Sequence, residues 1–175
     1  LMIADEAKPL AMAGIMGGEE SGITLETTEL FLESAFFAPK VIAGRARRYG
    51  FASDASHRFE RGVDFGGTRA AIERATQLIL EICGGQAGPV VKAKAELPAR
   101  TPVRLRTARA EKVLGLTLGA ERIAGLFKGL ALSFVQQGDD FLVTPPSWRF
   151  DMEIEEDLIE EVARLYGYDN IPSPA

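Results

Sequence analysis

The sequence has a single cysteine, a single histidine and a single tryptophan among its 175 residues. One cysteine excludes an internal disulfide framework and a metal site built from thiolates. Cys83 lies inside an apolar helical pattern, which predicts a buried, unreactive thiol. No stretch approaches the ~20 apolar residues of a membrane span, and the pattern of a secretory leader does not occur. These absences predict a cytoplasmic protein with no membrane partner.

An excess of basic charge is also missing. The chain has 20 Lys and Arg residues against 25 Asp and Glu residues, for a net charge of −5. Residues 1–98 hold 11 basic against 13 acidic side chains, and residues 99–175 hold 9 against 12. This balance excludes a broad electrostatic footprint for nucleic acid. Any contact with nucleic acid is expected to be local, or shared with a larger assembly.

The first part of the chain, residues 1–98, mixes strands and helices. It starts inside an apolar strand, which suggests a fragment of a longer protein, and a turn at residues 5–9 leads to a second strand at residues 10–13. Residues 22–37 favour strands, residues 40–49 are helix-like, and residues 68–83 have helical apolar spacing that ends at a glycine pair. The arginines of the helix-like segment can meet phosphate or form a solvated face; they are Arg45, Arg47 and Arg48.

The second part, residues 99–175, has shorter elements. We expect a strand at 103–106, helices at 107–114 and 120–128, a hairpin from 131–136 and 141–144, and a helix at 153–166. Three helices and a hairpin predict a winged-helix-like module. The whole chain is therefore predicted to be an α+β protein with two domains, 1–98 and 99–175.

Two features of the first part carry functional groups. Eight of the twelve residues from Ser53 to Asp64 bear a hydroxyl, a charge or an imidazole, so this stretch is either a solvated loop or a packed polar network that lines a site. Glu33 lies between Phe31-Leu32 and Ala35-Phe36-Phe37. A carboxylate in that setting lies on the wet face of a strand or is buried against a specific partner, because unpaired burial is costly.

Acidic side chains gather at the last helix. Glu153, Asp157, Glu160 and Glu161 share one side of a helical wheel, and Asp151 lies just upstream. Acids near a helix N-terminus suit its dipole, and Glu160 can pair with Arg164. The same carboxylates also offer hard oxygen ligands to Mg²⁺ or Ca²⁺.

Five strings in the chain carry a specific resemblance. They are AMAGIMGG (11–18), LESAFF (32–37), SDASHRFERGVD (53–64), PSWRFD (146–151) and EEDLIEEVARLYGYDNIP (155–172). Together and in this order they resemble the beta subunits of bacterial phenylalanyl-tRNA synthetases. The resemblance implies that residues 1–98 are the later part of the editing, tRNA-binding domain, truncated at its N-terminus. Residues 99–175 would be the winged-helix-like accessory module that precedes the catalytic-like core.

The resemblance also assigns roles to residues. In that family the editing domain hydrolyses the ester of tyrosine wrongly attached to phenylalanine tRNA. Glu33 matches the acid that receives the tyrosine hydroxyl, and the rest of the pocket corresponds to Gly17, Gly18, Ser53 and Ala55. No catalytic nucleophile is visible, so the fragment alone is expected to edit poorly or not at all. The part of the polar stretch after Ala55 would be an internal scaffold in which Arg58, Glu60, Arg61 and Asp64 pair and His57 hydrogen-bonds.

In the second part, Asp151, Asp157, Glu160 and Glu161 match the family's Mg²⁺ positions, which the beta subunit shares with the alpha subunit. The implied partners are the alpha subunit, in a tetramer of two alpha and two beta subunits, and phenylalanine tRNA. ATP is used by the full enzyme and is not bound by this fragment. The competing hypothesis is a non-catalytic module that binds nucleic acid or a partner subunit. A free-standing deacylase is disfavoured because the chain starts within a strand and runs on past its last helix.

Overall fold

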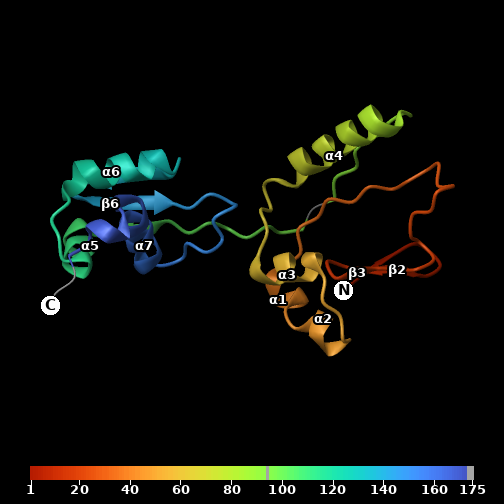
Figure 1. Cartoon of the computed structure of the whole chain (residues 1–175), viewed down its shortest axis with the longest axis horizontal. Coiled ribbons are helices and arrows are strands. Elements are labelled where there is room, and N and C mark those ends of the chain that lie inside the picture. Colours follow the sequence, from red (N-terminus) through yellow and green to blue (C-terminus); the bar gives the residue numbers. More distant parts are fainter. Residues whose placement is uncertain (94, 173–175) are drawn as a thin grey trace. The chain divides into compact units, whose positions relative to one another are not determined.

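A computed structural model describes residues 1–93 and 95–172 of the chain. The chain forms two compact units, Leu1–Ala95 and Glu96–Ala175. Each unit combines helices with a three-stranded sheet, so the α+β prediction is confirmed (Figure 1).

The sheet of the first unit contains β1 (Met2–Ala4), β2 (Pro9–Met12) and β3 (Met16–Gly17), each antiparallel to the next. The turn between β1 and β2 is held by the Asp5 carboxylate, which accepts the backbone N–H groups of Ala7 and Lys8 at 2.8 and 2.7 Å. The predicted hairpin is therefore confirmed. The glycine-rich turn after β2 returns the chain into β3.

Two short helices replace the single predicted helix of residues 40–49. They are α1 (Pro39–Ile42) and α2 (Arg45–Arg48). Gly44 separates them with a left-handed φ of 71°, a conformation that glycine adopts without steric cost. Ile42 and Ala46 point into a small core with Ile15, and Met12, Phe37 and Phe59 pack against it.

The polar stretch is helical rather than a loop. Helix α3 spans Asp54–Arg61, and its N-cap is Ser53. Helix α4 (Thr68–Cys83) follows, as its apolar spacing predicts, and ends at Gly84 with a φ of 72°.

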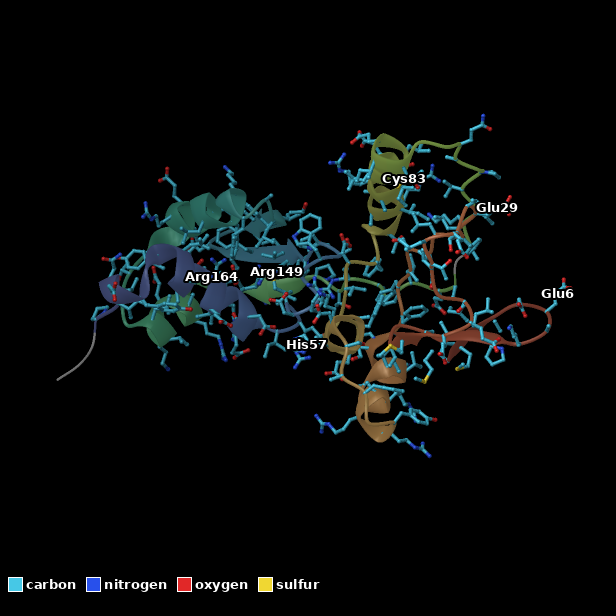
Figure 2. All side chains as sticks on the ribbon, turned by 45° about the vertical axis from the view of Figure 1, so that its right-hand side comes forward. Glu6, Glu29, His57, Cys83, Arg149 and Arg164 are labelled. Carbon is cyan, nitrogen blue, oxygen red and sulfur yellow. The ribbon has the colours of Figure 1, made fainter. Side chains whose placement is uncertain are left out.

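Two expectations about the first unit are wrong. Residues 22–37 form no strand within the described part of the chain, and Leu25 and Phe31 are 107% and 93% exposed. Helix α4 has no buried residue. Cys83 lies at its end with an exposed side chain, so the predicted burial of this thiol is a misassignment (Figure 2). Strand propensity and helical periodicity mark which side chains favour burial, but burial itself requires a packing partner.

The second unit contains β4 (Val103–Leu105), α5 (Thr107–Leu114), α6 (Gly119–Gly129), β5 (Ser133–Gln137), β6 (Asp140–Thr144), α7 (Glu155–Tyr166) and a 3₁₀ turn, η1 (Tyr168–Asn170). Its sheet has the order β4-β6-β5 and is antiparallel throughout. The predicted helices and hairpin are confirmed within one or two residues at most ends. Thr107 is the first residue of α5, and its hydroxyl donates to the Asp139 carbonyl.

The core of the second unit is larger than that of the first. Three rings, Phe127, Phe134 and Phe141, pack edge to face or tilted at centroid distances of 5.5 to 5.8 Å. Leu158 and Val162 of α7 are fully buried in the same cluster. Helix α7 therefore docks on the module through its apolar side. Among the described residues, no helix is long and apolar enough to cross a membrane.

Candidate functional site

A cavity of about 300 Å³ opens in the first unit at the glycine-rich turn. Its size lies at the lower end of the range for small-molecule sites. Two of its lining residues, Phe37 and Phe59, are aromatic, and most of the other lining residues are aliphatic. The lining residues are Ile3, Ala11, Met12, Ala13, Gly14, Ile15, Met16, Gly17, Glu33, Ala35, Phe37, Ala55 and Phe59. The cavity thus has apolar walls and a single ionisable group.

That ionisable group is Glu33. Its side chain lines the cavity and is exposed. Within residues 1–93 and 95–172, no hydrogen bond or ion pair engages its carboxylate. A carboxylate with free acceptor sites at an apolar cavity can receive a hydroxyl group from a molecule that enters it.

Gly17 lines the cavity and Gly18 does not. A Cβ atom added at Gly17 would meet no atom within 4 Å, so packing within the chain does not require glycine there. A Cβ added at Gly18 would lie 2.4 Å from the Leu10 carbonyl oxygen, and the N–H of Gly18 donates to the same oxygen at 2.8 Å. Gly18 therefore serves the close approach of backbone segments, whereas Gly17 leaves space.

Ala55 lines the cavity from the first turn of α3, whereas Ser53 is not among the lining residues. The Ser53 hydroxyl donates to the Ile15 carbonyl at 2.6 Å and accepts the backbone N–H of Ser56 at 3.1 Å. The Ser56 hydroxyl in turn lies 3.3 Å from the Ser53 N–H, which completes a capping box. Ser53 thus fixes the start of α3 against a cavity-lining segment.

The rest of the polar stretch forms only part of the expected network. Arg61 contacts the His57 ring nitrogen Nδ1 at 2.9 Å and pairs with Glu60 at 3.0 Å. The Asp64 carboxylate accepts the N–H of Gly66 at 2.8 Å. The expected pairing of Arg58 and Asp64 with the other charges does not occur among the described residues. His57, which is labelled in Figure 2, therefore belongs to a local network on the exposed surface of α3.

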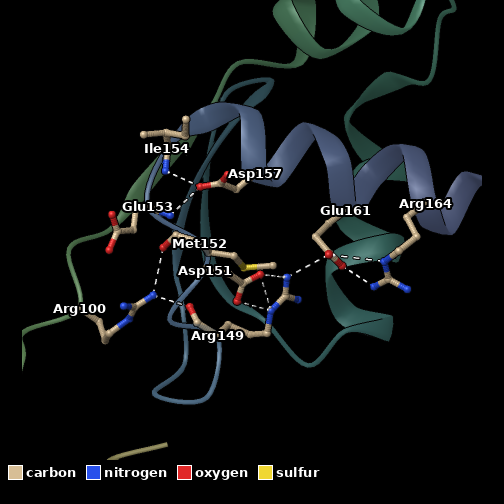
Figure 3. A network of polar contacts seen from close by, with 9 residues as sticks. All are labelled: Arg100, Arg149, Asp151, Met152, Glu153, Ile154, Asp157, Glu161 and Arg164. Atoms are coloured by element: carbon tan, nitrogen blue, oxygen red, sulfur yellow. Dashed lines mark hydrogen bonds and ion pairs between the residues drawn. The ribbon is translucent and has the colours of Figure 1, made fainter. Parts of the chain in front are cut away.

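The second unit holds a denser polar cluster, which Figure 3 shows, around Arg149. The Arg149 guanidinium pairs with Asp151 at 2.6 Å and with Glu161 at 2.9 Å. Arg164 also pairs with Glu161, whose side chain is only 8% exposed. Arg100 donates to the carbonyls of Arg149 and Met152 at 2.5 and 3.0 Å. Sequence inspection singled out these acids but missed Arg149 as their shared partner; the signal was its place in the PSWRFD string.

The charges of this cluster shift its pKa values. The hydrogen bond from Arg149 lowers the pKa of Asp151. Burial alone would raise the pKa of Glu161, but the hydrogen bonds from Arg164 and Arg149 outweigh it and the pKa is lowered. At the start of α7, the hydrogen bond from Arg106 lowers the pKa of Glu155. All three side chains are therefore carboxylates at neutral pH.

Two family models match the chain. The B3/4 domain model covers residues 1–84 and the tRNA synthetase B5 domain model covers residues 103–168. Proteins named phenylalanine–tRNA ligase beta subunit match almost all of the chain: 87% identity over 99% of it in Dechloromonas aromatica, 67% over 100% in Aromatoleum aromaticum, and 64% over 100% in Chromobacterium violaceum. The chain belongs to the phenylalanine–tRNA ligase beta subunit family.

The chain spans about a fifth of the length of these relatives, since it covers 22% of each of the three. Its two family models lie one in each compact unit, B3/4 in the first and B5 in the second. The cavity therefore belongs to the B3/4 part of the family, and the arginine cluster belongs to the B5 part.

The magnesium expectation for the B5 unit does not fit the contacts of its acids. Asp151 and Glu161 share Arg149, and Asp157 accepts the backbone N–H groups of Glu153 and Ile154 at 2.7 and 2.8 Å. Only Glu160 is exposed and outside these contacts. Within residues 1–93 and 95–172, no three acidic, histidine or cysteine side chains converge as a metal site. The Arg149 guanidinium, and not an open set of oxygen ligands, lies between Asp151 and Glu161 in this structure.

Proposed function

We propose that the B3/4 unit forms part of a site that removes tyrosine wrongly attached to phenylalanine tRNA. The observation that carries the proposal is the convergence of Glu33, Gly17 and Ala55 on one apolar cavity. These three residues are separated by 16 and 22 positions along the chain, and the fold alone brings them together.

The cavity suits an aromatic amino acid side chain. Phe37 and Phe59 lie with ring centroids 5.0 Å apart at the cavity wall, and they offer apolar and edge contacts to a third ring. Gly17 has no side chain to occupy the cavity, and no atom of the chain lies within 4 Å of where its Cβ would be. Glu33 supplies an acceptor for a phenolic hydroxyl.

The carboxylate is the basis of selectivity in this proposal. Tyrosine and phenylalanine differ by one hydroxyl. A site built to hydrogen-bond a hydroxyl can reject the analogue that lacks it by ~10⁴–10⁵. With phenylalanine in the cavity, the Glu33 carboxylate would lose solvent on its cavity side and gain no donor in return. Correctly charged tRNA would therefore be spared.

The chemistry is hydrolysis of an ester. A water oxygen adds to the carbonyl carbon, the carbonyl oxygen becomes an oxyanion, and collapse breaks the bond to the ribose oxygen, which takes up a proton. Preorganised donors at the oxyanion are the usual source of rate in such reactions. In the described part of this chain, the lining residues supply the side-chain pocket and no nucleophile or general base. The groups at the ester therefore come from the substrate or from other parts of the full-length protein, and residues 1–175 alone are expected to be inactive or nearly so.

The remaining features of the ligase are proposals that rest on the relatives' names. As part of a beta subunit, the chain would assemble with an alpha subunit and act on phenylalanine tRNA in the cytoplasm. ATP and Mg²⁺ would serve the aminoacylation reaction elsewhere in the enzyme. The B5 unit would act as a structural module, which its continuous core and the pairing of Arg149 with Glu161 of α7 support.

The test uses the full-length protein assembled as an active ligase. Glu33→Ala is expected to abolish discrimination between tyrosyl and phenylalanyl esters of phenylalanine tRNA, because both side chains then meet only apolar walls. Glu29→Ala, an exposed glutamate of the same segment that does not line the cavity, is the matched control and should behave as the parent protein. The measurement is the rate of amino acid release from each charged tRNA. Parent-like discrimination in Glu33→Ala would remove Glu33 from this role.

A further inference from the structure

The exposed surface of α1, α2 and α3 is strongly basic, although the whole chain is acidic. Between residues 38 and 62 there are six basic side chains and two acidic ones, Asp54 and Glu60. The basic side chains are Lys40, Arg45, Arg47, Arg48, Arg58 and Arg61. Each is exposed, and among the described residues only Arg61 forms an ion pair.

This basic segment continues directly into two exposed rings. Tyr49 is 60% exposed and Phe51 is 40% exposed. The backbone of these two residues is held in place, because the N–H groups of Tyr49 and Phe51 both donate to the Ala46 carbonyl, at 3.1 and 2.9 Å. Gly50, between them, has a φ of 75°, which makes the chain turn tightly. Guanidinium groups and rings are thus presented together by a short, ordered segment.

The segment adjoins the cavity through its buried side. Ala46 of α2 packs in the small core with Ile15, which also lines the cavity, and Phe59 packs against that core. Within the same compact unit, the basic segment and the cavity therefore adjoin one small packed cluster.

We infer that the surface of Arg45, Arg47, Arg48, Tyr49 and Phe51, here named the arginine–aromatic surface, binds a single-stranded RNA segment beside the cavity. Arginine side chains neutralise backbone phosphates, and exposed rings stack on unpaired bases. The combination fits unpaired RNA better than a duplex, whose bases are stacked on one another. This inference rests on the proposed function, in which the unpaired 3′ end of a charged tRNA delivers its amino acid to the cavity. The surface would hold the nucleotides that precede the amino acid.

The first experiment measures tRNA affinity against salt concentration for the full-length protein. Arg45→Gln/Arg48→Gln removes two charges from α2. It is expected to reduce the slope of log K against log salt by about 1.4 and to weaken binding roughly tenfold at moderate salt. The control, Arg69→Gln/Arg74→Gln, removes two exposed charges from α4 in the same unit, where the side chains contact Glu73 and Gln77. The control slope should equal that of the parent. An unchanged slope in the α2 variant, or an equal loss in the α4 variant, would overturn the inference.

The second experiment separates unpaired RNA from other anions. Tyr49→Leu keeps an apolar side chain but loses the ring. It should weaken the binding of intact tRNA about tenfold. It should leave unchanged the binding of a tRNA that lacks its unpaired 3′ end. Equal losses for the two tRNAs, or equal competition by an acidic peptide of matched charge, would contradict the inference. Glu33→Ala distinguishes this claim from the proposed function, because it should alter selective hydrolysis without changing the salt slope.

Discussion

At the scale of single residues, Gly17 and Gly18 are neighbours with opposite steric surroundings. A methyl group at Gly17 has open space, whereas one at Gly18 would collide with the Leu10 carbonyl oxygen. Gly18→Ala should therefore destabilise the β1–β3 sheet by roughly 1–3 kcal/mol, and Gly17→Ala should leave it unchanged. Hydrogen exchange of the sheet amides in the full-length protein measures both. Faster exchange in Gly17→Ala would contradict the free space that the structure shows beside this residue.

The residue roles were only partly predictable from the sequence. The resemblance identified Glu33, Gly17 and Ala55 together, and the structure places them in one cavity, although their roles in editing stay predictions. It also assigned Ser53 and Gly18 to the pocket, but their hydrogen bonds and packing give them support roles beside it. A small or polar residue near a pocket does not reveal in the sequence whether its side chain faces the cavity or the backbone behind it.

At the scale of elements, α3 shows how a polar stretch becomes ordered. It has few apolar positions, so helical periodicity does not reveal it, and its start depends on the Ser53–Ser56 capping box and the bond to Ile15. Ser53→Ala should destabilise α3 by about 1–2 kcal/mol, because an N-cap and a tertiary hydrogen bond are both lost. Ser53→Thr keeps the hydroxyl and should retain most of that stability. The amide exchange rates of α3 in the two variants provide the measurement, and equal rates in Ala and Thr variants would argue against the capping role.

Helix α7 depends on ion pairs whose carboxylates have lowered pKa values. Such groups bind protons more weakly in the folded unit than in the unfolded chain, so their stabilisation is present above the unfolded pKa of ~4 and is lost as the pH falls through the lower folded pKa. The B5 unit should therefore lose stability progressively below about pH 4.5. Since the only tryptophan, Trp148, lies in this unit, its fluorescence during denaturant unfolding reports the loss.

Arg149→Met tests the origin of that pH dependence. Losing the guanidinium beside the buried Glu161 should cost about 2 kcal/mol at neutral pH, a moderate value because Arg164 still pairs with Glu161. The variant should also lose less stability than the parent on acidification. Arg122→Met, at an exposed position of α6, is the control and should keep the parent pH profile. A parent-like profile in Arg149→Met would show that other carboxylates are responsible.

The elements of the B5 unit were more predictable than those of the B3/4 unit, for a physical reason. In the B5 unit, apolar periodicity, turn glycines and a hairpin turn agree, and the core they predict is continuous. In the B3/4 unit, residues 22–37 have strand propensity but no strand partner in the described chain, and α4 has apolar positions that nothing in it buries. Periodicity predicts the face of an element that favours burial and does not supply the surface that covers it.

At the scale of the whole molecule, the first unit contains the cavity and the second unit contains the larger core. The B3/4 unit combines an open apolar cavity with a basic, aromatic surface, whereas the B5 unit pairs its acids with arginines and buries Glu161 among them. The chain covers about a fifth of the length of its relatives, since it spans 22% of the Dechloromonas aromatica protein. In the proposed function, residues 1–175 contribute the side-chain pocket, and the groups that act on the ester belong to the substrate or to the full-length protein.

The most direct test of this account is the binding of two non-hydrolysable analogues, a tyrosyl and a phenylalanyl adenosine joined through an amide, to the full-length protein by calorimetry. We expect the tyrosyl analogue to bind much more tightly than the phenylalanyl analogue, and we expect Glu33→Ala to lose most of that difference while Glu29→Ala keeps it. Equal binding of the two analogues to the parent protein, or an undiminished preference for tyrosine in Glu33→Ala, would contradict recognition of the tyrosine hydroxyl by Glu33.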